Sequence, residues 1–235
     1  MNRRRASPRN GRSGRGTGCA LTVIALVALL CFVAFVVGRV VAAPELGAAV
    51  SGNADGTTTK AISSHVAASV LGQFLRPGPL GEHAVVVVTE RDLTVIARSS
   101  NPDPAKYQDP EVRIRDSYVV VSAAAKLGTL KVIAVARATL LLSGVAAGNA
   151  RIATDIVSVD LGRQAIPDFM RSAIDPRGSA ALSLDPIFNA SPQLKPLRQS
   201  LECLYIGTDG IYLGFHRPGV APVTTSCVPA GAGIP

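Results

Sequence analysis

The chain has 235 residues and carries 24 lysines and arginines against 16 acidic residues, a formal net charge of +8. Seven of the arginines lie before Pro44 and no acidic residue does, so the rest of the chain carries 17 basic against 16 acidic residues. Because the excess positive charge belongs to the N-terminal tail, the composition excludes a basic nucleic-acid-binding face on the main domain.

The N-terminal region predicts a membrane anchor. Residues 1–18 are basic and almost free of apolar side chains, which predicts a disordered cytoplasmic tail. From Cys19 to Gly38 there are 20 residues without a charge, and as a helix they extend about 30 Å, the thickness of a hydrocarbon core. We therefore expect a transmembrane signal-anchor helix over residues 19–43, in a protein that crosses the cell membrane once.

The distribution of arginines predicts the orientation of this anchor. Six arginines precede the apolar segment and one follows it, which places the N-terminus in the cytoplasm and the main domain outside the membrane. The alternative is a cleaved signal peptide, because Val41-Ala42-Ala43 fits the small-residue cleavage pattern. Both readings export the main domain.

After a Gly- and Ala-rich linker over residues 44–56, the extracytoplasmic domain is expected over residues 57–217 and begins with a helix. Threonines from Thr57 onward offer N-caps for a helix that runs to about Leu75. Apolar residues recur every four positions along it and predict one buried face; these are Ile62, Val66, Val70 and Phe74. Ala67 and Leu71 broaden this apolar stripe.

A strand and a short helix follow. Val85–Val88 is a β-branched run typical of a strand. Thr89-Glu90-Arg91-Asp92 then resembles a capping box, so a short helix is expected to about Ala97. We interpret Glu90 and Asp92 as capping residues and not as paired catalytic carboxylates, since two positions apart on a helix they point in different directions.

The rest of the domain predicts β-structure. Short strands joined by tight turns from Glu111 to Leu161 indicate an antiparallel meander, with one turn at Leu127-Gly128-Thr129. Pro167 suits the first turn of a helix that ends near Ile174. Leu201–Ile206 and Ile211–Phe215 flank Asp209-Gly210 and predict a closing hairpin. The expected fold class is α+β, with a long amphipathic helix packed against a strongly curved antiparallel β-sheet.

Two cysteines predict a disulfide bond. Cys203 and Cys227 are the only cysteines of the exported domain, and an oxidising compartment favours a bond between them. The bond would tether the C-terminal tail, residues 218–235, to a strand. The alternative is two unpaired thiols in a reducing setting. Cys19 and Cys31 lie in the membrane segment.

No constellation of residues specifies a reaction. His65, His83 and His216 show no metal-ligand spacing, and no nucleophile elbow or phosphate-binding Gly-rich loop is present. We therefore expect a protein without catalytic residues, metal or cofactor.

Apolar surface is the remaining candidate for function. An amphipathic helix beside a curved sheet whose strands are apolar on both faces can leave a crevice that suits acyl chains. The alternative is that helix and sheet close on each other into a dry core. The residues expected to line such a groove are Val66, Val70, Phe74, Val119, Val121, Val132 and Ile133.

The order of these signals from Thr57 to Arg217 resembles the YpmS-like and LmeA-like families of bacterial membrane-anchored envelope proteins. Three segments carry the resemblance: Thr89–Thr94, Gly162–Pro167 and Tyr205–Leu213. The resemblance implies a tubular lipid-binding-like domain and, for LmeA-like members, phospholipid binding and maturation of cell-envelope glycolipids.

Together these observations predict a membrane-anchored extracytoplasmic domain that binds a lipid or a lipid-linked envelope precursor in an apolar groove. The alternative hypothesis is a non-catalytic structural protein that docks a cell-envelope or division partner.

Overall fold

The computed structural model describes residues 16–46, 57–101, 103–115, 117–148, 150–167, 184–223 and 227, and within helix α1 the side chains from residue 25 onward. The chain divides into two compact units, with the boundary between Arg39 and Val40. Helix α1 spans Gly16–Val41. Among the residues described, no helix combines the length and the hydropathy that crossing a membrane requires.

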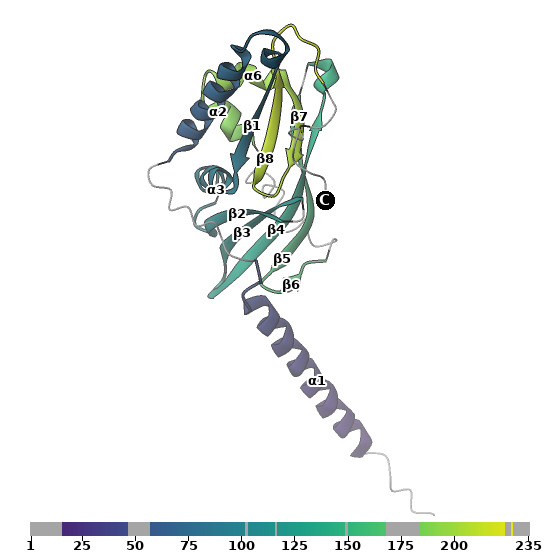
Figure 1. Cartoon of the computed structure of the whole chain (residues 1–235). Coiled ribbons are helices and arrows are strands. Elements are labelled where there is room, and N and C mark those ends of the chain that lie inside the picture. Colours follow the sequence, from purple (N-terminus) through teal and green to yellow (C-terminus); the bar gives the residue numbers. More distant parts are fainter. Residues whose placement is uncertain are drawn as a thin grey trace, which may run out of the picture. The chain divides into compact units, whose positions relative to one another are not determined.

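The second unit is an α+β domain with antiparallel sheets, which confirms the predicted class. A three-stranded sheet has the order β1-β8-β7 and a five-stranded sheet the order β2-β3-β4-β5-β6 (Figure 1). The strands are β1 (His83–Thr89), β2 (Tyr107–Arg115), β3 (Tyr118–Leu127), β4 (Leu130–Ser143), β5 (Arg151–Leu161), β6 (Gln164–Ala165), β7 (Leu201–Ile206) and β8 (Gly210–His216). The helices of this unit are α2 (Thr59–Phe74), α3 (Glu90–Ser99), α5 (Asp185–Ala190) and α6 (Leu194–Leu197), with short 3₁₀ turns η1 (Gly78–Gly81), η2 (Val145–Ala147) and η4 (Arg198–Ser200).

The predicted meander corresponds to β2–β5, and the predicted closing hairpin is β7–β8. The expectation of one strongly curved sheet is wrong, because β8 pairs along its whole length with β1 and the strands therefore separate into two sheets. The helix predicted from Pro167 to Ile174 lies outside the described residues apart from its first position.

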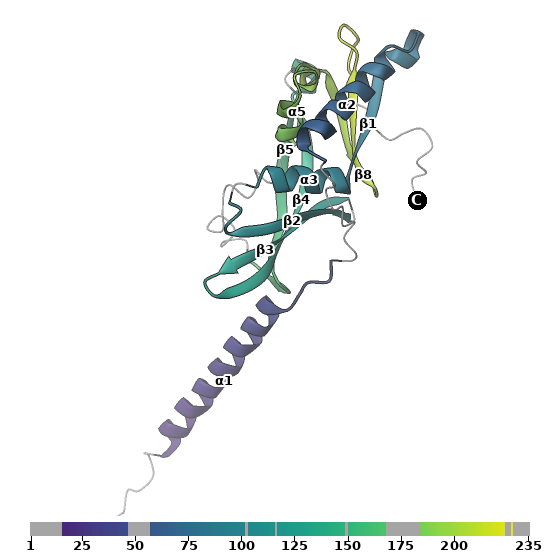
Figure 2. The ribbon, with the colours of Figure 1, turned by 90° about the vertical axis from the view of Figure 1, so that its left-hand side faces the viewer.

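Helix α2 has the predicted buried face but is not strongly amphipathic. Ile62, Val66, Val70 and Phe74 are buried as expected. Leu71, predicted to broaden the stripe, is 43% exposed. The outward face also carries alanine and glycine, so its polarity differs little from that of the buried face. The helix packs against β1 and α5 (Figure 2).

Helix α3 begins with the predicted capping box. The Thr89 hydroxyl accepts a hydrogen bond from the Asp92 amide, and the Asp92 carboxylate accepts one from the Thr89 amide at 3.1 Å. Glu90, interpreted from the sequence as a cap residue, has another role. It is 7% exposed, and its Oε1 accepts hydrogen bonds from the Ile114 amide at 2.6 Å and from Arg115 at 2.8 Å.

Glu90 is the first of three side chains by which α3 closes the edge of β2. Thr94 accepts a hydrogen bond from the Val112 amide at 2.9 Å and donates one to the Val112 carbonyl at 3.4 Å. Arg98 donates from Nε to the Pro110 carbonyl at 3.2 Å. Four helical residues rise about 6 Å and two strand residues about 6.6 Å, so every fourth side chain of α3 meets every second residue of β2. We call these contacts the α3–β2 seam.

The Gln73 side chain of α2 likewise bonds the backbone at the edge of a strand, here at one residue of β1. Its side-chain amide donates to the Val85 carbonyl at 3.0 Å, and its side-chain oxygen accepts from the Val85 amide at 3.1 Å. The side chain therefore replaces one residue of a neighbouring strand, and it holds the C-terminal end of α2 against the sheet.

The apolar core lies between α2 and α3, the inner faces of both sheets, and the short helices α5 and α6. Phe188 of α5 and Phe215 of β8 pack with ring centroids 6.5 Å apart. Ser63 of α2 is fully buried and donates a hydrogen bond to the Ile187 carbonyl at 2.6 Å. This bond satisfies a polar group inside the core and ties α2 to α5.

The α3–β2 seam predicts a specific loss of stability. Thr94→Val keeps the side-chain shape but leaves the amide and carbonyl of Val112 without their partner inside the protein. We expect the free energy of unfolding to fall by about 1–3 kcal/mol. The measurement is denaturant unfolding of residues 40–235. Thr208→Val, at an exposed turn residue, is the matched control and should stay near the wild-type value. An equal, small effect of both variants would show that the seam does not stabilise the domain.

Candidate functional site

Five of the seven residues predicted to line a groove belong to the apolar core cluster of the domain, which spans both sheets and the helices. They are Val66, Val70, Phe74, Val119 and Val121. The other two predicted residues, Val132 and Ile133, are not part of this cluster. Val132 is buried outside the cluster, near the β3–β4 turn, and Ile133 is half-buried and lies on the opposite face of the strand.

The five clustered residues contact protein and not solvent in this conformation. Their exposed fractions range from 0% at Val70 to 9% at Val121. The arrangement corresponds to the closed core that the sequence analysis gave as the alternative to a groove. A ligand must therefore enter this region from a neighbouring opening or displace α2.

Such an opening lies between the start of α2 and the end of α3. It is a widely open hollow of about 550 Å³ on the surface of the domain. Its lining comes from the first turn of α2 and the last turns of α3, namely Thr57, Thr58, Thr59, Lys60, Val95, Arg98 and Ser99. Val95 belongs both to this lining and to the apolar core.

Two hydrogen bonds build the hollow. The Thr58 hydroxyl accepts from the Ala61 amide at 3.2 Å and so caps α2. The hydroxyls of Thr59 and Ser99 lie 2.6 Å apart and join the beginning of α2 to the end of α3. The seam already fixes α3 to β2, so this bond also fixes the start of α2 relative to the sheet.

The rim of the hollow is positive. Lys60 and Arg98 are both exposed and line it, and no acidic residue lies in the first turn of α2. The nearest contact of Arg98 to a carboxylate is 4.0 Å, to Glu111. The N-terminal end of a helix adds a partial positive charge. A lining that combines the buried apolar residue Val95 with the cations Lys60 and Arg98 suits an amphiphile with a negative headgroup.

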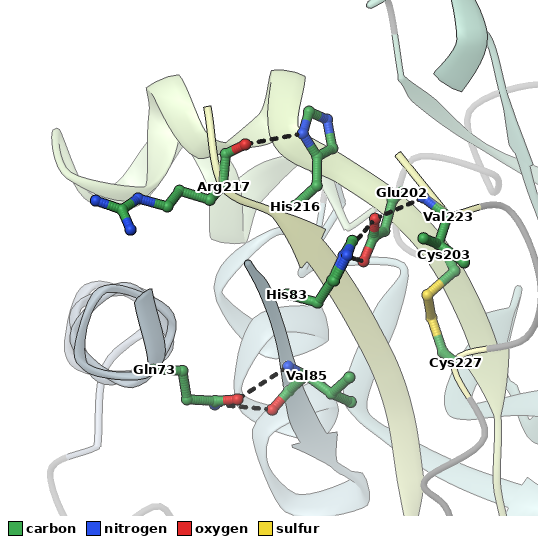
Figure 3. A network of polar contacts seen from close by, with 9 residues as sticks. All are labelled: Gln73, His83, Val85, Glu202, Cys203, His216, Arg217, Val223 and Cys227. Carbon is green, nitrogen blue, oxygen red and sulfur yellow. Dashed lines mark hydrogen bonds and ion pairs between the residues drawn. A yellow bond between two sulfur atoms is a disulfide. The ribbon is translucent and has the colours of Figure 1, made fainter. Parts of the chain in front are cut away.

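A second polar cluster lies where β1, β7 and β8 meet the C-terminal segment (Figure 3). His83 Nδ1 lies 3.0 and 3.1 Å from the two carboxylate oxygens of Glu202. Glu202 is 5% exposed and also accepts a hydrogen bond from the Val223 amide at 2.9 Å. His216 turns toward the carbonyl of Arg217. The contacts of His83 and Glu202 therefore hold the C-terminal segment against β7.

The predicted disulfide bond between Cys203 and Cys227 is present next to this cluster. Cys203 pairs in register with Gly214 on β8. A Cβ atom at Gly214 would clash with the Sγ atoms of both cysteines. Glycine is required there because the disulfide occupies the space of a side chain.

The described residues contain no group of three side chains that could hold a metal ion. Tyr212 of β8 lies next to Asp209 of the β7–β8 turn. Its hydroxyl donates to Asp209 at 3.0 Å, and this hydrogen bond, with smaller effects of burial and nearby charge, raises the pKa of Tyr212 above its ordinary value. A neutral phenol at physiological pH is a hydrogen-bond donor and a poor nucleophile.

Comparison with known proteins adds no relative, since no family model, curated protein or solved structure matches the chain.

The disulfide predicts a redox-dependent stability. It closes a loop with a sequence separation of 24 residues, and loop-closure entropy assigns such a bond about 3 kcal/mol. Reduction should lower the free energy of unfolding of residues 40–235 by roughly that amount, measured by denaturant unfolding with and without reductant. The double variant Cys203→Ser/Cys227→Ser should match the reduced protein and should not respond to reductant. Equal stability of the oxidised and reduced wild type would contradict this role.

Proposed function

We propose that this protein is a membrane-anchored extracytoplasmic domain that binds a lipid or a lipid-linked envelope precursor. In this proposal the apolar stretch from Cys19 to Gly38 anchors the chain in the cell membrane, with the N-terminus in the cytoplasm. The observation that carries the lipid-binding part is the hollow with a cationic rim, which shares Val95 with the apolar core.

The proposed mechanism is passive binding. The headgroup would lie at the rim beside Lys60 and Arg98, where a negative charge is attracted by both cations and by the start of α2. The acyl chain would enter toward Val95 and leave water, gaining about 0.8 kcal/mol for each buried CH₂ group. The domain would act as a carrier or receptor and catalyse no reaction.

Deeper entry of an acyl chain has a definite structural requirement. The predicted groove residues on α2 and β3 are already buried in the core, so α2 would have to move away from β1 and α5, against which it packs. The contacts that oppose such a movement are the Ser63 hydrogen bond to α5 and the Gln73 hydrogen bonds to β1. The hollow itself requires no such movement and is therefore the first binding position.

The resemblance to the YpmS-like and LmeA-like families supports the same proposal. The quoted segments Thr89–Thr94 and Tyr205–Leu213 correspond to the start of α3 and to the β7–β8 hairpin. In the proposal, these segments form the frame of the lipid-binding domain, and the hollow lies beside the end of α3.

A second candidate function is docking of an envelope or division protein. The outward face of the three-stranded sheet favours it, because three apolar or aromatic side chains there remain substantially exposed: Val85 at 38%, Val87 at 37% and Tyr205 at 40%. Apolar side chains gathered on one sheet face are typical of interaction surfaces. This function would not require a lipid in the hollow.

The lipid-binding proposal predicts the effect of filling the hollow. Ser99→Trp places a large ring at its lining on an exposed helical position. We expect native mass spectrometry of residues 40–235, incubated with phosphatidylglycerol, to show one bound phospholipid per wild-type chain. The Ser99→Trp variant should lose most of the bound fraction.

Ala68→Trp is the matched control, since Ala68 is exposed on α2 outside the hollow lining. It should bind like the wild type, and circular dichroism should show all three proteins folded. Absence of phospholipid from the wild type, or undiminished binding by folded Ser99→Trp, would refute the site and favour the docking function.

A further inference from the structure

The turn between β3 and β4 has an unusual composition for an exposed hairpin. Leu127 and Leu130 are paired in register across the turn, and Lys126 and Lys131 form the next pair. Gly128 has a φ of 63°, which a tight turn of this kind requires and glycine adopts without strain. The sequence order is therefore lysine, leucine, a two-residue turn, leucine, lysine. We call residues 126–131 the hairpin tip.

This arrangement is unfavourable in water. Both lysines are exposed, and like charges directly opposite each other on neighbouring strands destabilise a hairpin. Leu130 is 47% exposed. At an anionic lipid surface the same features become favourable, since lysines are attracted to the negative headgroups and an apolar side chain can enter the boundary with the acyl chains.

Contacts within the second unit hold Ala43 and Glu45, which follow α1 in the chain, against the turn between β5 and β6. Arg163, in the turn between β5 and β6, donates to the Ala43 carbonyl at 2.9 Å and to the Glu45 carboxylate at 3.0 Å. The next residue back, Gly162, donates its amide to the Ile133 carbonyl at 2.7 Å. The two turns lie at the same end of the sheet (Figure 1).

Short stretches of chain separate both the hairpin tip and the end of α1 from the β5–β6 turn. Ile133, which contacts the β5–β6 turn, is three strand residues from Leu130, about 10 Å. Glu45, held at the same turn, is four residues after the last residue of α1, at most about 14 Å of extended chain. The hairpin tip and the end of α1 are therefore each connected to the β5–β6 turn by only a few residues.

We propose that the hairpin tip contacts the anionic phospholipid surface of the membrane that holds α1. Leu130 enters the interface and Lys126 and Lys131 bind headgroups. The contact rests on the proposed membrane anchor, but it involves a surface distinct from the lipid-binding hollow. Lys106 extends the positive surface, because its ammonium group lies over the Tyr107 ring and its carbonyl accepts the Lys126 amide.

The test uses the full chain, which contains no tryptophan, so a single introduced tryptophan is its only indole signal. Leu130→Trp is reconstituted into phosphatidylcholine vesicles with and without phosphatidylglycerol, in which the acyl chains carry bromine as a quencher. Leu141→Trp is the matched control, because Leu141 is 54% exposed on the same strand, eleven residues from Leu130. Flotation of the vesicles reports the anchor separately.

We expect Leu130→Trp fluorescence to shift to the blue and to be quenched when phosphatidylglycerol is present, while Leu141→Trp remains unquenched. Adding Lys126→Glu and Lys131→Glu should abolish the quenching while the chain still floats with the vesicles.

Chains that float but show equal quenching at both positions would overturn the contact and leave the anchor intact. Quenching that does not depend on phosphatidylglycerol would overturn the role of the lysines. Failure to float would overturn the anchor and the contact together, while the binding of lipid by residues 40–235 would still decide the function of the hollow.

Discussion

Three polar side chains on one face of α3 replace the strand that would otherwise extend the five-stranded sheet beyond β2. Glu90, Thr94 and Arg98 bond successive outward-facing backbone groups of β2 because the rise of four helical residues nearly equals that of two strand residues. An open edge invites pairing with another chain. The seam closes that part of the edge within the domain, and α3 directly follows β1, which pairs with β8 in the other sheet.

The position of the hollow follows from this constraint. The seam fixes α3 along β2, so the position of the last turn of α3 relative to the sheet is also fixed. The hydrogen bond between Thr59 and Ser99 then holds the start of α2 next to this last turn. At the other end of α2, Gln73 bonds to β1. The helix is thus held at both ends by hydrogen bonds and along its middle by apolar packing. The hollow at its N-terminal end is lined by Lys60 and by Arg98, which also donates the seam hydrogen bond to the Pro110 carbonyl.

Local signals in the sequence predicted the elements well. The capping box at Thr89, the turn at Gly128, the β7–β8 hairpin and the pairing of Cys203 with Cys227 each depend on residues close in sequence or on a choice with few alternatives. The division into two sheets could not be predicted in this way, because it depends on pairing between β1 and β8, which are more than a hundred residues apart.

The candidate site also depends on contacts between residues that are distant in sequence, which local sequence signals do not predict. Glu90 looks like a cap residue in the sequence because its position at the first turn of a helix is typical of one, and only the fold brings Ile114 to it. Val66 and Val121 were expected in one groove and do lie in one cluster, but whether such a cluster is open or packed depends on volumes that spacing does not encode. The hollow was not predicted. Its lining comes from two helix ends that are joined by hydroxyl groups, and these hydroxyl residues form no recognisable sequence motif.

The most direct test of this account is hydrogen–deuterium exchange of residues 40–235 with and without phosphatidylglycerol. The seam predicts slow exchange of the Val112 and Ile114 amides under both conditions, since side chains of α3 accept both of their hydrogen bonds. Lipid in the hollow predicts that amides in the first turn of α2, from Lys60 onward, exchange more slowly only when phosphatidylglycerol is present. Rapid exchange at Val112 and Ile114, or no effect of lipid at the start of α2, would contradict the account.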